Sequence, residues 1–171
     1  MQADAPSPDP AAAPWEESTI PRVALAAAAR YGDAPALVDE EGGATLSFRE
    51  LLARGLEVAR ALLARGLAPG DRVGLWAPNL PAWVPAALGL QMAGGVLVPL
   101  NTRFKAPEAG FILRRSRARW LFTVGDFLGQ NYADVLRDEE LPHLEGIVRL
   151  RGEAKAGVPF EAFLAEGEAV A

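Results

Sequence analysis

Apolar residues recur at helical spacing in the segment that follows Ser47. They stand three or four residues apart, which places them on one face of a helix: Leu52, Leu56, Ala59 and Leu63. Ser47 and Glu50 match the pattern of a capping box, in which each side chain accepts a hydrogen bond from the other residue's backbone N–H. The pattern therefore predicts a helix that begins at Ser47 and stops at Gly66.

Short apolar runs alternate with further helical segments through the rest of the chain. The runs typical of strands lie at 72–77, 96–100, 119–124 and 146–150. The segments between them with helical character lie at 81–93, 107–115 and 127–136. Alternation at this spacing predicts parallel β-α-β units. We therefore expect an α/β fold, a mainly parallel sheet with flanking helices.

The stretch at 89–101 joins a helix to the second of these strands. Gly94 and Gly95 allow positive φ and close backbone approach, so they are expected to end the helix. The strand at 96–100 is predicted to be buried on both faces. Pro99 either ends that strand or places it at an edge of the sheet, because proline has no backbone N–H to donate.

The two ends of the chain carry simpler patterns. Residues 19–31 predict a helix with Pro21 near its start, and residues 35–39 and 44–48 predict a hairpin around a turn at 40–43. A short helix is expected at 160–165. Residues 1–17 are rich in Pro and Ala and contain no secretory pattern, so they predict a disordered leader to one domain at 18–171.

Composition narrows the classes of function. The chain has 171 residues, a net charge of -5, no Cys and one His, His143, which nearly excludes disulfide scaffolds, Cys/His zinc sites and Cys or Ser-His-Asp nucleophiles. The acidic balance argues against nucleic-acid binding, and the basic cluster at 114–119 is interpreted as a solvated helix end. No apolar stretch reaches the roughly 18 residues of a transmembrane helix. We expect a cytoplasmic protein with His143 on its surface.

Phosphate-binding loops are the next test for an α/β chain. Neither G-x-x-x-x-G-K-[ST] nor G-x-G-x-x-G between a strand and a helix is present, which disfavours a nucleotide-dependent oxidoreductase. Gly89, Gly94 and Gly95 lie where a helix leads into a strand, the wrong end of the unit for phosphate, so we assign them to close packing and helix termination. The residue pattern alone shows no catalytic constellation.

Two motifs carry a family resemblance. "LSFREL" at 46–51 and "LQMAGGVLVPLN" at 90–101 resemble the first two core motifs of the adenylate-forming (ANL) superfamily, in the same order and spacing. The likeness extends over about 19–150 and is nearest to the acyl-CoA synthetase branch, because Asn101 stands where peptide-building members usually have Asp. The resemblance implies that the fold is the N-terminal subdomain of an AMP-binding adenylating enzyme.

The resemblance also implies a reaction. Members of this branch use ATP and Mg²⁺ to convert a carboxylic acid to an acyl-adenylate and then transfer the acyl group to coenzyme A. The family's phosphate loop, its later magnesium-binding acid, its ribose-binding Asp and the Lys of its C-terminal domain are not in this sequence. We therefore expect the N-terminal portion of a ligase, truncated before the phosphate loop and inactive alone, without catalytic residues or metal ligands of its own.

By the same resemblance, Asn101, Thr102 and Arg103 lie toward the coenzyme A entry side, where Arg103 could meet a phosphate. The structural alternative is that Asn101 caps a turn and Arg103 pairs with a carboxylate. A second function also stays open, a non-catalytic α/β interaction module that pairs with a partner chain. Fatty, aromatic and steroid-derived acids remain candidate substrates, a homodimer remains open, and the fragment is expected to expose an apolar face.

Overall fold

A mainly parallel sheet forms the centre of the computed structural model, which describes residues 19–39, 43 and 45–170. Among these residues, five strands pair in the order β4-β3-β5-β8-β9, and every pair in this sheet is parallel. The strands are β3 (Arg72–Trp76), β4 (Val96–Pro99), β5 (Trp120–Val124), β8 (Gly146–Arg151) and β9 (Val158–Pro159). The predicted fold class is confirmed.

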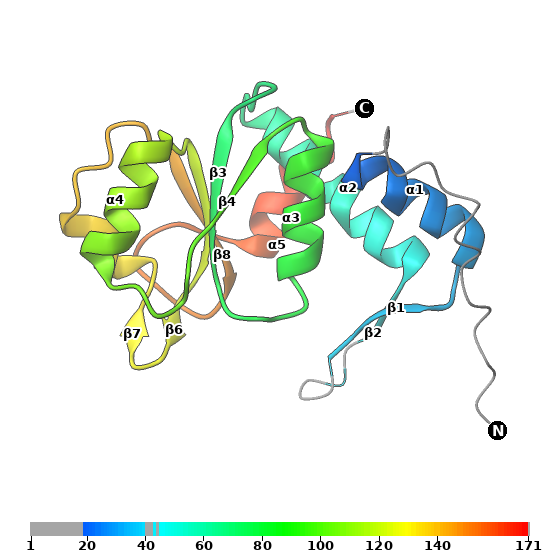
Figure 1. Cartoon of the computed structure of the whole chain (residues 1–171), viewed down its shortest axis with the longest axis horizontal. Coiled ribbons are helices and arrows are strands. Elements are labelled where there is room, and N and C mark those ends of the chain that lie inside the picture. The colour runs from blue at the N-terminus through cyan, green and yellow to red at the C-terminus, as the bar shows by residue number, and fades with distance from the viewer. Residues whose placement is uncertain (1–18, 40–42, 44, 171) are drawn as a thin grey trace.

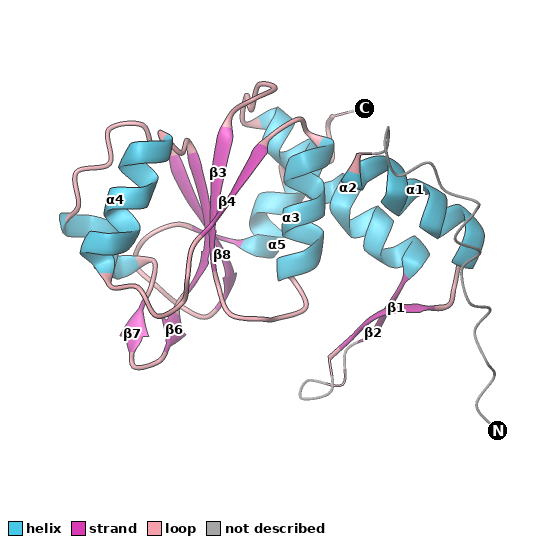
Figure 2. Cartoon of the chain, in the orientation of Figure 1, coloured by secondary structure: helices cyan, strands magenta, loops and turns pink. Residues whose placement is uncertain are grey.

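Helices cover both faces of this sheet (Figures 1 and 2). On one face lie α2 (Phe48–Ala64), α3 (Trp83–Met92) and α5 (Phe160–Ala165), and on the other lies α4 (Ala106–Ser116). Beyond α2 lie α1 (Ile20–Tyr31) and the antiparallel hairpin of β1 (Pro35–Val38) and β2 (Thr45–Ser47). One apolar core runs between the sheet and its covering helices.

Local signals set most helix ends where the sequence predicts them. The Glu50 N–H donates to the Ser47 hydroxyl at 3.2 Å, and the Ser47 N–H donates to the Glu50 carboxylate at 2.8 Å, so the capping box is confirmed. This contact lowers the pKa of Glu50. The helix predicted at 81–93 begins two residues later in the structure, because α3 starts at Trp83 and Pro81 lies in the turn before it. Pro85 therefore lies in the first helical turn.

The position of β4 corrects one prediction. Among the described strands β4 lies at the edge of the sheet, as one alternative for Pro99 predicts, but it is not buried on both faces, since Val96 is 48% exposed. The Val96 N–H donates to the backbone oxygen of Asp71, directly before β3, and the Leu100 N–H donates to that of Leu75 in β3. By alternation the intervening Pro99 has its missing N–H on the free side. Proline therefore stands where a strand loses no ladder hydrogen bond.

The predicted helix at 127–136 is wrong. This segment forms the antiparallel hairpin of β6 (Asp126–Phe127) and β7 (Gln130–Asn131), followed by the 3₁₀ helix η2 (Asp134–Asp138). The turn residues Leu128 and Gly129 both have positive φ, 49° and 73°, which is the geometry of a tight two-residue hairpin turn and breaks a helix. The apolar spacing alone does not reveal this turn.

The remaining predicted elements have different outcomes in the structure. The expected helix at 160–165 is confirmed as α5, and β9 before it is an addition. The predicted leader at 1–17 and most of the turn at 40–43 lie outside the described residues. No helix in the described part of the chain is both long and apolar enough to cross a membrane.

The basic cluster at 114–119 divides among separate roles. Arg114 pairs with Glu139 at 2.8 Å, and Arg117 ends α4 in the left-handed conformation. Arg119 joins the amino edge of the sheet: it pairs with Asp71 and donates two hydrogen bonds of 2.7 Å to Glu145. These three residues directly precede β3, β5 and β8. The predicted helix end is thus correct for part of the cluster only.

This network predicts a pH-dependent contribution to stability. Bonding to Arg119 lowers the pKa of Glu145, and the Ala68 N–H and Arg119 lower that of Asp71. Because both pKa values are depressed on folding, the contribution is present above about pH 4 and is lost as the pH falls through the folded values. We expect Arg119→Met to reduce the free energy of unfolding at pH 7 by about 1 kcal/mol, since the groups are partly solvated.

Urea unfolding between pH 3 and pH 7 measures this effect. Arg115→Met is the matched control, because it removes the same charge from an exposed site in the same cluster. The difference between the Arg119 variant and the native chain should shrink below about pH 4. A difference that stays constant over this range would show that Arg119 acts through packing instead.

Candidate functional site

A cleft of about 580 Å³ lies at the carboxyl edge of the sheet, where β3 and β4 end. Its walls come from the segments after these two strands, from the start of α3 and from β6. The lining residues are Ala77, Pro78, Asn79, Trp83, Leu100, Asn101, Thr102 and Phe127. Two of the three residues predicted to face a ligand therefore lie on this cleft.

The topology explains why a cleft forms there. From β3 the chain continues into α3 on one face of the sheet, whereas from β4 it continues into α4 on the opposite face (Figure 1). The two connections diverge, so no helix closes the space between the strand ends. Ligands of open α/β sheets bind at such switch points, outside the carboxyl ends of the strands.

Asn101 shapes the loop on one side of the cleft. Its side-chain oxygen accepts a hydrogen bond from the Arg103 N–H at 2.9 Å, and its backbone oxygen accepts bonds from the Phe104 N–H and the Trp76 indole N–H, each at 3.0 Å. The predicted turn-capping role of Asn101 is confirmed. Its role toward a ligand stays a prediction.

Thr102 and Arg103 differ in position. Thr102 is half-buried on the cleft, and its backbone oxygen accepts a hydrogen bond from the Tyr132 hydroxyl. Arg103 is exposed and does not line the cleft. Among the described residues Arg103 forms no ion pair, so the alternative that it pairs with a neighbouring carboxylate is not observed.

The turn at Asn101 can be tested by substitution. Asn101→Ala removes the acceptor for the Arg103 N–H, and we expect a loss of about 1 kcal/mol in the free energy of unfolding. Asn101→Asp retains an acceptor oxygen at the same place and should lose less than half as much. Urea denaturation of the two variants measures this difference. Equal losses would show that the side-chain bond contributes nothing.

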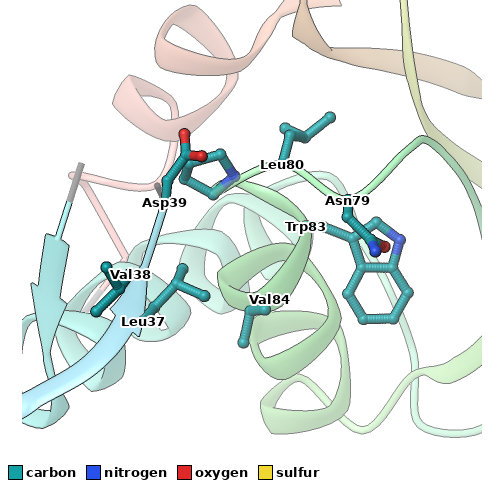
Figure 3. A pocket seen from close by; sticks show the side chains of 8 residues that line it. Leu37, Val38, Asp39, Asn79, Leu80, Trp83 and Val84 are labelled. Carbon is teal, nitrogen blue, oxygen red and sulfur yellow. The ribbon is translucent and has the colours of Figure 1, made fainter. Parts of the chain in front are cut away.

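A second, smaller hollow of about 260 Å³ shares Asn79 and Trp83 with the cleft (Figure 3). Its walls are mostly apolar and join the end of β1 to the start of α3. Figure 3 shows Asn79 beside the Trp83 ring, and both residues line both cavities. Trp83 is therefore half-buried between two cavities, in contrast to the fully packed Trp76.

The chemistry of the cleft is neutral. The residues that line it carry no charged side chain, while aromatic rings and two amides are present. Within the described ranges, no group of three or more His, Cys, Asp or Glu is placed to hold a metal ion. His143 is exposed, as predicted. This arrangement suits an aromatic or amide-containing part of a ligand rather than a metal-bound phosphate.

Fold and cleft place the chain among the α/β proteins that bind ligands at the carboxyl edge of a parallel sheet. The chain belongs to the family of AMP-binding enzymes, whose profile matches residues 25–166. The resemblance of its two motifs to adenylate-forming enzymes is thereby confirmed.

Similar proteins fall in the acyl-CoA ligase branch. The 3-[(3aS,4S,7aS)-7a-methyl-1,5-dioxo-octahydro-1H-inden-4-yl]propanoyl:CoA ligase of Rhodococcus jostii is 41% identical over 124 residues, 72% of this chain and 24% of that protein. The mitochondrial medium-chain acyl-CoA ligase ACSF2 of Danio rerio is 33% identical over 124 residues, 72% of this chain and 20% of that protein. The chain thus spans a quarter or less of the length of these relatives.

Solved structures agree with this placement. The anthranilate CoA ligase AuaEII, in complex with anthranoyl-AMP, has a TM-score of 0.73 and 27% identity, over 85% of this chain and 26% of that chain. A long-chain-fatty-acid CoA ligase from Rhodopseudomonas palustris, described as putative, has a TM-score of 0.75 and 25% identity, over 85% and 36%. The described fold is that of one part of these larger enzymes.

Of the eight residues that line the cleft, the sequence predicts only Asn101 and Thr102 as site residues, and it misses both aromatic ones, Trp83 and Phe127. Trp83 falls in the helix predicted at 81–93 and Phe127 in the helix predicted at 127–136, and neither prediction places them on a cleft. The rule that clefts open where parallel strands end could have indicated Trp83, which starts the helix after β3. Phe127 has no such signal, because an unexpected hairpin brings it to the cleft.

Proposed function

We propose that residues 18–171 form the N-terminal part of an ATP-dependent acyl-CoA ligase. The parent enzyme would activate a carboxylic acid as an acyl-adenylate and transfer the acyl group to coenzyme A. The observation that carries this proposal is the family match over residues 25–166 together with the acyl-CoA ligases among its relatives. This chain alone is expected to be inactive.

The chain's own residues limit what it can contribute. ATP, Mg²⁺ and coenzyme A are expected for the parent enzyme, but the described residues hold no cluster of three or more His, Cys, Asp or Glu side chains around a metal position. The sequence also lacks a phosphate-binding loop. Stabilising the charge that develops on the transferred phosphates requires such donors, so we assign that chemistry to other parts of the parent.

The cleft between β3 and β4 is our candidate for the coenzyme A side of the enzyme. Asn101 and Thr102 line it, and the exposed Arg103 stands next to them, free to approach a phosphate that projects into solvent. The aromatic rings of Trp83 and Phe127 would suit the planar base of the nucleotide end. The rest of the parent would pack on exposed apolar positions such as Val96 and Phe111.

Thioester formation tests the proposal. ATP, coenzyme A and a panel of carboxylic acids are supplied to this chain and, in parallel, to the longest open reading frame that contains it. The panel includes fatty and aromatic acids and the methyl-dioxo-octahydroindenyl propanoate named for the Rhodococcus relative. Activity in the longer protein alone supports the proposal.

Other outcomes of this experiment would favour a different function. Failure of the longest frame on every acid, with the chain recovered in complex with another protein, would favour a non-catalytic interaction module. Gel filtration of the chain checks whether it forms a homodimer. We further propose a cytoplasmic location and a role in fatty acid metabolism, which are tested by cell fractionation and by the acid that the longer protein uses.

A further inference from the structure

Two buried aromatic side chains hold the loop that lines the cleft. The Trp76 indole N–H donates to the backbone oxygen of Asn101 at 3.0 Å, and the Tyr132 hydroxyl donates to the backbone oxygen of Thr102. Neither Asn101 nor Thr102 can shift relative to these rings without breaking a hydrogen bond. The main chain of the loop is therefore fixed from beneath as well as by its own turn.

These two rings form one packed unit. Trp76 and Tyr132 are both fully buried, and their rings stack with centroids 4.3 Å apart and planes at 24°. A buried hydroxyl must find a hydrogen-bond partner, and the partner of Tyr132 is the loop. A phenylalanine ring would pack here equally well. Among the described residues, only the hydrogen bond to the loop requires the hydroxyl of Tyr132.

Tyr132 also contacts the opposite wall of the cleft. The Phe127 ring, which lines the cleft, meets the Tyr132 ring edge-on at 5.9 Å and 81°. From the same hairpin, the Gln130 side-chain amide donates to the backbone oxygen of Phe104 at 3.4 Å. The β6–β7 hairpin and the loop at 101–104 are thus joined at two points.

We infer that Tyr132 is a positioning residue that locks these two walls, the loop at 101–104 and the hairpin at 126–131, into one unit around the cleft. This inference rests on the proposed function for its ligand, the nucleotide end of coenzyme A. Tyr132 does not line the cleft, and its hydroxyl is bound to the loop. It acts on ligand binding by fixing Thr102 and Phe127 relative to each other.

Amide hydrogen exchange on the chain itself tests whether Tyr132 holds the loop at 101–104 in place. Tyr132→Phe should speed exchange of the Arg103 and Phe104 amides by about tenfold, while the amides of β5 stay protected. Thr123→Val is the matched control, because it also removes a buried hydroxyl bonded to a backbone oxygen, that of Trp76 at 2.9 Å. Unchanged loop exchange in Tyr132→Phe, or equal acceleration in both variants, overturns the role of Tyr132.

Kinetics of the active parent ligase test whether Tyr132 affects the binding of coenzyme A. Tyr132→Phe should raise the KM for coenzyme A about five- to tenfold, with kcat and the KM for ATP unchanged, whereas Thr123→Val should change none of them. A general loss of structure would lower kcat as well. If exchange at the loop accelerates but the KM for coenzyme A does not change, the position assigned to coenzyme A is wrong, and so is the effect of Tyr132 on its binding.

Discussion

Gly89→Ala should lower the free energy of unfolding by about 2–3 kcal/mol, as for other overpacked cores. Gly89 lies on α3 where this helix crosses α2. A methyl group there would collide with the Val58 side chain and would stand 2.5 Å from the backbone oxygen of Gly55. A backbone oxygen inside a helix cannot move aside, so the two helices must separate. This loss outweighs the gain of up to about 1 kcal/mol that alanine brings to a helix.

Gly55→Ala provides the control at the same crossing. Its added methyl group would meet the end of the Leu88 side chain at 3.0 Å, a flexible group that can rotate away. We expect a change of less than about 1 kcal/mol, because helix propensity offsets the mild contact. Urea denaturation of both variants measures the difference. Similar values for the two would show that the crossing adapts and that Gly89 is not required for close packing.

The Gly89 result bears on what sequence can predict. Its position before a strand excludes a phosphate loop, and the assignment to close packing follows from that exclusion. Gly94, with a φ of 82°, ends α3 as predicted. Helix ends of this kind depend on residues that are neighbours in the sequence, so they can be predicted without knowledge of the fold. The capping box at Ser47 belongs to the same class.

Strand order is not a local property, and the predicted burial of the strand at 96–100 on both faces is wrong. The run at 96–100 is apolar enough for a central strand, yet β4 pairs only with β3 among the described strands. Which strand lies beside it depends on the crossing of α4 over the sheet. The presence of Pro99 is the sequence's clue, because it predicts either a strand end or an edge strand, and β4 is the edge among the described strands.

The hairpin at 126–131 is a second feature that the sequence does not predict. Leucine is a poor residue for positive φ, so Leu128 argues against the turn that it forms. Tertiary contacts, such as that of Phe127 with Tyr132, hold the hairpin in place. For the same reason only part of the cleft follows from the sequence: Asn101 ends the second motif and Thr102 follows it, whereas Phe127 reaches the cleft through the hairpin.

Phe163→Ala should lower the free energy of unfolding by about 3–5 kcal/mol, the usual loss for a buried phenylalanine. Phe163 lies on α5 and is fully buried. Its ring meets the Phe122 ring edge-on at 5.7 Å and the Trp120 ring at 6.5 Å, both on β5. Removing it leaves a cavity beneath α5, a helix of 6 residues. Phe163→Leu fills most of that space and should cost about 1 kcal/mol.

The outcome decides whether α5 belongs to the cooperative unit of the fold. Polar contacts also join α5 and the residues after it to α2: Arg54 pairs with Glu161 at 2.5 Å, and Arg65 donates to Glu166 at 2.6 Å. If the unit is cooperative, Phe163→Ala shifts the urea transition of the whole chain. Proteolysis confined to the residues after 157, with an unshifted main transition, would instead show that α5 opens alone, and the domain would then end at β8.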